Sequence, residues 1–206
     1  MKKDEIIKRV MDIFSTYGVR TVSIDFIAQS IPLAKKDLLQ IAKNKEGLIE
    51  LIFEYRYELA QKLYEKTNKE TENAIDTLLK MSIYAYKNQN EFKPMLDFEF
   101  NKYYPDLYRK YNDTCEHEFA ESIKNNIAIG KKEGIYRTDL NPDITTHLYI
   151  EKIRMLHSQL ADYELKWKPH KLFTEALINH IRGISTIKGI QYFEEKKHII
   201  QHLLDD

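Results

Sequence analysis

A short cationic stretch that follows Pro32 carries the side chains whose types and spacing are best suited to chemistry. Lys35 and Lys36 come first, and Gln40 and Lys43 follow them. Ammonium groups bind phosphates, and both ammonium and carboxamide groups can hydrogen-bond to base edges in the major groove of DNA. The chemistry that this stretch predicts is therefore non-covalent contact with duplex DNA.

Two very short helical patterns, joined by a break, would position these side chains. Ser23 can cap a first helix whose inward residues are Ile24, Ile27 and Ala28. The pattern stops at residues 30–32, because proline lacks an amide donor and restricts the residue before it.

A second helix then begins near Leu33 or Ala34. Leu38 and Ile41, three residues apart, would face the first helix, and the polar side chains would point outward. Before this pair, a helix with apolar residues Ile6, Val10, Ile13, Phe14 and Tyr17 ends at Gly18. Together, these three predicted helices have the outline of a helix-turn-helix domain.

Composition restricts the class of protein. The 206 residues include 32 basic and 32 acidic side chains, so any affinity for DNA must come from a local patch. Residues 1–50 hold nine Lys or Arg and seven Asp or Glu, which gives a net charge of only 9 − 7 = +2. The single cysteine, Cys115, excludes an internal disulfide. No signal peptide or membrane-spanning run is visible, so we expect a cytoplasmic protein with no membrane contact.

Helical periodicity runs through nearly the whole chain, and the few glycines and prolines argue against an all-β fold. The sequence predicts an all-α protein: a small N-terminal three-helix domain over 1–47, and a larger helical bundle over 48–206. A helix over 45–67 would connect them. Further helices are predicted at 71–89, 92–103, 105–132, 142–163, 169–186 and 188–204.

These pieces together resemble the TetR family of bacterial transcriptional regulators. The matching segments are IIKRVMDIFSTYG (6–18), RTVSIDFIAQS (20–30), LAKKDLLQIA (33–42), NKEGLIELI (44–52) and GKKEGIYRTDLNPDI (130–144). The resemblance is good over the first 50 residues and extends to helix order in the remainder. It implies a regulator, most often a repressor, that binds double-stranded operator DNA.

The DNA-facing groups divide by role. Arg20, Ser23, Lys43 and Lys45 would contact phosphates, and Lys45 matches a phosphate-contacting lysine of the family. The candidate base readers are Lys35, Lys36, Asp37 and Gln40. Leu39 stands where the family usually has a phosphate-contacting tyrosine. Either the lysines supply the backbone contacts, or DNA binding has been weakened.

The second region would bind a ligand. Its aromatic side chains are more numerous than a small bundle needs, and they suggest an apolar pocket with a few polar groups for a small apolar or aromatic molecule. The candidate lining residues are Tyr84, Phe92, Met95, Phe98, Tyr103, Tyr111, Cys115, His117 and Met155.

Late helices carry apolar faces that, by the resemblance, would pair with the same helices of a second copy. These faces hold Leu148, Ile150, Ile153, Leu156 and Leu160, then Leu172, Phe173, Leu177, Ile178 and Ile181. A twofold homodimer would place two recognition helices about 34 Å apart, which predicts a pseudo-palindromic operator.

No enzymatic pattern emerges, and no cofactor or metal is expected. A di-iron bundle needs two Glu-x-x-His motifs, and only the pair Glu195 and His198 fits. The sequence leaves one alternative to the ligand-responsive repressor: a ligand-binding or partner-binding dimer whose degenerate helix-turn-helix no longer reads DNA.

Overall fold

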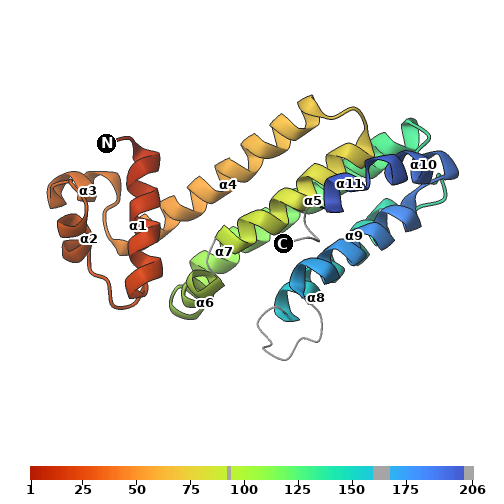
Figure 1. Ribbon diagram of the computed structural model, residues 1–206. Coiled ribbons are helices and arrows are strands. Elements are labelled where there is room, and N and C mark those ends of the chain that lie inside the picture. The colour runs from red at the N-terminus through yellow and green to blue at the C-terminus, as the bar shows by residue number, and fades with distance from the viewer. Residues whose placement is uncertain (92–93, 160–167, 202–206) are drawn as a thin grey trace. The chain divides into compact units, whose positions relative to one another are not determined.

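The structure is a computed structural model that describes residues 1–91, 94–159 and 168–201. Regular structure in these ranges is helical, and a lone bridge pairs Tyr136 with Ser185. The chain has an all-α architecture in which a helix-turn-helix comes first and a helical bundle follows (Figure 1). By packing it forms two compact units: residues 1–65 with 88–116, and residues 66–87 with 117–206.

The first unit contains α1 (Lys3–Tyr17), α2 (Ile24–Ser30), α3 (Lys35–Ile41) and α6 (Pro94–Tyr103). It also includes most of α4 (Lys45–Glu70) and the start of α7 (Pro105–Lys132). Helix α1 packs against α2 and α6, and α2 packs against α3. The core is aliphatic and aromatic, and fully buried members include Val10, Phe14, Ile27, Leu38, Ile49 and Phe100.

The second unit contains most of α5 (Ala74–Glu91), the rest of α7, α8 (Pro142–Gln159), α9 (Pro169–Ile184), α10 (Ile187–Lys196) and α11 (His198–Gln201). Helix α9 packs against both α8 and α10. Its core is separate from that of the first unit, and fully buried members include Ile75, Leu78, Tyr136, Tyr149, Leu177, Ile181 and Phe193. The predicted domain boundary at residue 47 separates DNA binding from ligand binding, and it stays a prediction. Packing, in contrast, groups residues 48–65 and 88–116 with the first unit.

Local sequence signals set the helix ends. Gly18 ends α1 with φ of 83°, in the left-handed region where glycine has no steric penalty, and its N–H donates to the Phe14 carbonyl. Helices α6, α7, α8 and α9 each begin at a proline, whose missing N–H would have no partner in the first turn. The last predicted helix is divided into α10 and α11.

Tyr17 corrects one sequence expectation. The apolar face of α1 buries Ile6, Val10, Ile13 and Phe14 as predicted, but Tyr17 is 57% exposed. Its ring packs edge-on against Phe26 of α2, with 5.1 Å between the ring centroids. The helical period continues to Tyr17, but the core of the unit does not cover the Tyr17 side chain.

Candidate nucleic-acid interface

Helices α2 and α3 pack against each other, and each buries one aliphatic side chain completely. Ile27 of α2 and Leu38 of α3 have no exposed surface, and Ile31 in the turn between the helices is also buried. The Ser23 hydroxyl accepts a hydrogen bond of 3.1 Å from the Phe26 N–H and so caps α2, as predicted. Each helix is only seven residues long, so packing rather than helix propensity must hold it.

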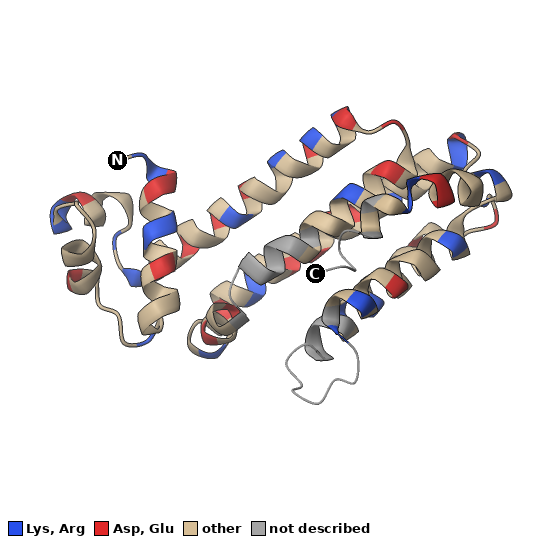
Figure 2. Cartoon of the chain, viewed as in Figure 1, with Lys and Arg blue, Asp and Glu red and all other residues tan. Residues whose placement is uncertain are grey.

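The predicted DNA-facing side chains of α3 point into solvent. Basic and acidic residues are next to one another along α3, as the blue and red parts of its ribbon show (Figure 2). The exposed residues on it and just after it are Lys35, Lys36, Asp37, Gln40 and Lys43. Leu39 is half-buried and offers no polar group. The second helix of the motif therefore has a buried aliphatic side and an exposed polar side, as a recognition helix requires.

One of these lysines has a carboxylate partner within the protein. The Lys35 ammonium lies 2.6 Å from the Asp25 carboxylate, and the pair joins the start of α3 to the first turn of α2. Both side chains remain about half exposed, at 51% and 61%. Together α2 and α3 carry two lysines and two aspartates, which gives a net charge of 2 − 2 = 0.

Lys45 and Arg20 lie close together at the edge of the motif. The Lys45 ammonium donates a hydrogen bond of 3.2 Å to the Arg20 carbonyl and lies 5.9 Å from the centre of the Phe14 ring. Partial burial lowers the pKa of Lys45, and the nearby Glu99 carboxylate offsets part of that effect. The Arg20 guanidinium lies over the Tyr103 ring at 5.8 Å. Both cations are thus held near the α1–α2 turn by contacts within the chain.

Glu99 of α6 contacts the backbone of that turn. Its carboxylate accepts a hydrogen bond from the N–H of Val19, a residue with no exposed surface. An acceptor from a distant part of the sequence thereby satisfies a buried backbone donor in the turn that follows α1. Helix α6 is in this way tied to the segment that orients α2. The sequence reasoning missed Glu99, because its partner is 80 positions away and no local pattern marks it.

A second link in the same unit joins α4 to α6. The Arg56 guanidinium makes paired hydrogen bonds of 2.6 and 3.2 Å to the Asp97 carboxylate. Burial lowers the pKa of Arg56, but Asp97, with smaller contributions from Tyr111 and Tyr108, more than offsets it, so the pKa is raised and the group stays charged. Bidentate pairing of this kind fixes orientation as well as charge. Sequence reasoning did not single out either residue.

An aromatic cluster lies beside this ion pair. Phe53 stacks on Tyr111 with a centroid distance of 4.6 Å and meets Phe100 edge-on at 5.1 Å. Arg56 lies 5.4 Å from the centre of the Tyr111 ring. Burial raises the pKa of Tyr111 against the opposing effect of Arg56, and Cys115 adds to the rise. Of the predicted ligand-binding residues, the structure brings Tyr111 and Cys115 together here.

The other predicted ligand-binding residues lie in different surroundings. Tyr103 is half-buried in the first unit, whereas Met95 and Phe98 on α6 are 67% and 60% exposed. Tyr84 is half-buried in the second unit, whereas His117 and Met155 are exposed there. Phe92 lies outside the described residues. The assignment of a pocket to these nine residues stays a prediction, and the eight that the structure describes are divided between the two units.

A buried polar group in the second unit also escaped sequence reasoning. The Tyr149 and Ser82 hydroxyls are 2.8 Å apart, and the His180 ring stacks on Tyr149 at 4.1 Å. Burial, with a further contribution from Lys152, lowers the pKa of His180 to about 3, so the ring is neutral at physiological pH. Its Nε2 atom is buried and has no hydrogen-bond partner among the residues that the structure describes. Because the three residues come from α5, α8 and α9, no local motif could have predicted the group.

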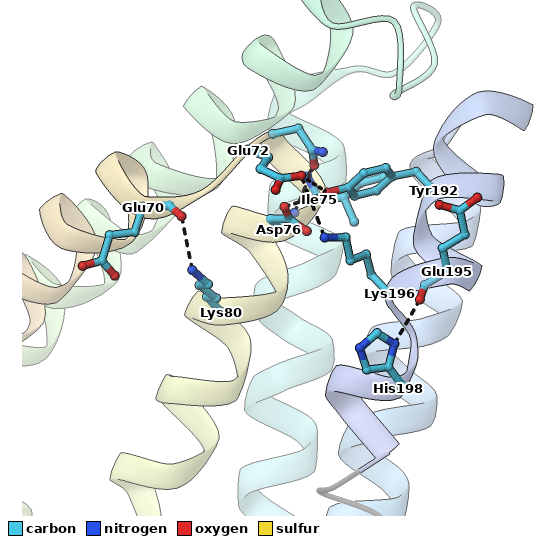
Figure 3. Close-up of polar contacts among 10 residues, drawn as sticks. Glu70, Glu72, Ile75, Asp76, Lys80, Tyr192, Glu195, Lys196 and His198 are labelled. Atoms are coloured by element: carbon cyan, nitrogen blue, oxygen red, sulfur yellow. Dashed lines mark hydrogen bonds and ion pairs between the residues drawn. The ribbon is translucent and has the colours of Figure 1, made fainter.

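Polar contacts also attach α10 to the beginning of α5 (Figure 3). The Tyr192 hydroxyl donates to the Asp76 carboxylate at 2.7 Å and lies 3.2 Å from that of Glu72. Lys196 forms a longer ion pair of 3.8 Å with Glu72. These carboxylates are used by protein donors. Across the described ranges, no three His, Cys, Asp or Glu side chains are grouped as a metal site requires, and no helix is long and apolar enough to cross a membrane.

Comparisons with known proteins agree with this architecture at the level of structure. No protein-family model matches the chain, and no curated protein matches it in sequence. A TetR-family transcriptional regulator from Cytophaga hutchinsonii superposes with a TM-score of 0.69 at 14% identity, covering 90% of this chain and 98% of the other. A gamma-butyrolactone receptor, an ArpA-like protein, gives 0.69 at 13% identity and covers 97% and 96%.

A third similar structure is a candidate transcriptional regulator from Saccharomonospora viridis in complex with choline. It superposes with a TM-score of 0.72 at 14% identity, covering 88% of this chain and 96% of the other. The similarity extends over nearly the full length of each protein. The chain therefore has the fold of TetR-family transcriptional regulators.

Proposed function

We propose that this protein is a ligand-responsive transcriptional regulator, a repressor, that binds a pseudo-palindromic DNA operator as a homodimer. One observation carries the proposal: a helix-turn-helix whose second helix buries Leu38 and exposes Lys36, Gln40 and the following Lys43. Such a helix can enter a major groove with its polar side toward base edges. Lys36 and Lys43 make no ion pair among the described residues, so their charge is available to phosphates.

The dimer part of the proposal rests on α8. Its surface carries three large apolar side chains, Ile144, Leu148 and Met155, that are 59%, 62% and 51% exposed. Helical spacing places them along one side of the helix, where a second copy could cover them. The predicted contribution of α9 stays a prediction. Leu172 is half-buried, and the other four residues of that face are buried in the core of their own unit: Phe173, Leu177, Ile178 and Ile181.

Ligand response would act through equilibrium between two arrangements of the first unit. Choline is bound in one structure with this fold, and another is a receptor for gamma-butyrolactones. We expect a small apolar or aromatic ligand here, whose effect on DNA affinity cannot exceed its own difference in affinity for the two arrangements. The Arg56–Asp97 pair and the contact between Glu99 and Val19 connect α4 and α6 to the α1–α2 turn.

The proposal is tested by DNA binding. Fluorescence anisotropy with the duplex upstream of the chain's own gene, against a random duplex of equal length, is measured over a series of salt concentrations. Lys36→Ala and Lys43→Ala should each weaken binding and reduce the salt slope by about 1. The matched control is Lys62→Ala on α4, an exposed lysine paired with Glu58, which should leave both quantities unchanged.

A second candidate function is favoured by the charge of the motif. The net charge of α2 and α3 is zero, Lys35 is paired with Asp25, and Leu39 is apolar. These features suit a ligand-binding or partner-binding dimer that no longer reads DNA. Equal, weak binding to the upstream and random duplexes would favour this second function over the first.

A further inference from the structure

The ion pair between Asp25 of α2 and Lys35 of α3 involves one of the lysines that could contact DNA. Lys35 is the first residue of α3, where the positive end of the helix dipole disfavours an ammonium group. Ala34, the preceding residue, provides no side-chain cap. The Asp25 carboxylate, 2.6 Å from the Lys35 ammonium, offsets this unfavourable position. The pair is therefore a favourable state of the free protein and must be given up when Lys35 binds a phosphate.

Both partners remain exposed, so the pair is exchangeable. With side chains 51% and 61% accessible, the interaction is of the weak surface type, which solvent and salt screen. A DNA phosphate brought to the same surface offers the Lys35 ammonium an alternative anion.

We propose that Asp25 competes with DNA for the Lys35 ammonium, and so holds the phosphate affinity of the α2–α3 surface below the value that its lysines would otherwise give. This inference rests on the proposed function, since it describes how the same surface is tuned. Phosphate contacts supply affinity without sequence information, so Asp25 lowers the affinity for operator and non-specific duplexes by the same factor.

The test combines Asp25→Asn and Lys35→Ala as single and double variants. Asp25→Asn should tighten binding to the upstream duplex by about two- to five-fold, the range expected for one exposed ion pair. The salt slope should become steeper by about 1, because one more lysine then contacts a phosphate. The gain should be equal on a random duplex of the same length. In the Lys35→Ala background it should disappear.

Asp37→Asn is the matched control, because Asp37 is an exposed carboxylate in the first turn of α3 without an ion pair among the described residues. Any gain from this change should be the same with and without Lys35. Thermal unfolding of every variant checks that α2 and α3 stay folded.

Three results would overturn the proposal: no gain from Asp25→Asn, a gain that persists without Lys35, or a gain confined to the upstream duplex. The first and second would leave the DNA-binding function intact and remove only the role of Asp25. A wild-type protein without salt-dependent preference for its upstream duplex would instead contradict the proposed function itself, and the role of Asp25 with it.

Discussion

Replacing Glu99 by alanine should destabilise the first unit by leaving a buried backbone donor without an acceptor. The Val19 N–H donates to the Glu99 carboxylate, and Val19 has no exposed surface, so water cannot readily replace the lost acceptor. An unsatisfied buried donor costs about 1–3 kcal/mol of unfolding free energy. Glu99→Gln keeps a carbonyl oxygen in place and removes only the charge. Because charge-assisted hydrogen bonds are roughly twice as strong as neutral ones, about half of that loss should be recovered.

Urea unfolding followed by circular dichroism would measure the two Glu99 variants. Glu50→Ala is the control, since Glu50 is an exposed carboxylate on α4 of the same unit, and its loss should change the free energy by less than about 0.5 kcal/mol. Equal destabilisation by alanine and glutamine would refute the reasoning, because the charge near Lys45 would then matter and the hydrogen bond would not. A Glu99→Ala protein as stable as the wild type would refute it as well.

Three further changes test other parts of the structure. Gly130→Ala should destabilise the second unit by about 1–3 kcal/mol in chemical denaturation, because its Cβ would lie 2.1 Å from the buried Tyr136 ring. The control Gly183→Ala, whose new Cβ meets none of the described neighbouring groups within 4 Å, should be neutral or stabilising by up to about 1 kcal/mol. His180 should make the free energy of unfolding depend on pH, because burial and Lys152 lower its pKa in the folded protein to about 3, whereas the unfolded value is about 6.5. Its contribution to stability is therefore complete above pH 6.5, and about 2 kcal/mol is lost between pH 7 and pH 5. His180→Phe should remove that part of the pH dependence, and a titration curve parallel to that of the wild type would contradict the assignment. Leu38→Ala should lower the free energy of unfolding by about 2–5 kcal/mol and abolish DNA binding, whereas Leu38→Met, of similar volume, should retain DNA binding. Calorimetry measures the stability and fluorescence anisotropy the DNA binding, and a larger loss from methionine than from alanine would contradict the prediction.

Local signals in the sequence were sufficient for most helix ends in the first unit. Ser23 caps α2, Gly18 ends α1, and Pro32 lies between the two short helices. Burial of Leu38 and exposure of the lysines on α3 were also predictable, because both follow from helical periodicity and side-chain polarity alone.

Contacts between distant segments were not predictable in the same way. Nothing near Glu99 indicates that its carboxylate caps the α1–α2 turn, and the Lys35–Asp25 pair depends on how two helices pack. The ligand site illustrates the limit most clearly. Aromatic content suggested a pocket, but composition cannot orient a side chain, and Met95 proves to be 67% exposed. An excess of aromatic residues is equally compatible with a core such as the one around Phe53.

Binding of the intact protein to its own upstream duplex, over a series of salt concentrations, tests the central claim most directly. If α3 is a recognition helix, affinity should exceed that for a random duplex of equal length and should fall steeply and linearly in a double-logarithmic plot against salt. Replacement of Lys36 should lower both affinity and slope. Identical affinities for the two duplexes, unaffected by Lys36→Ala, would contradict the claim that the exposed side of α3 reads DNA.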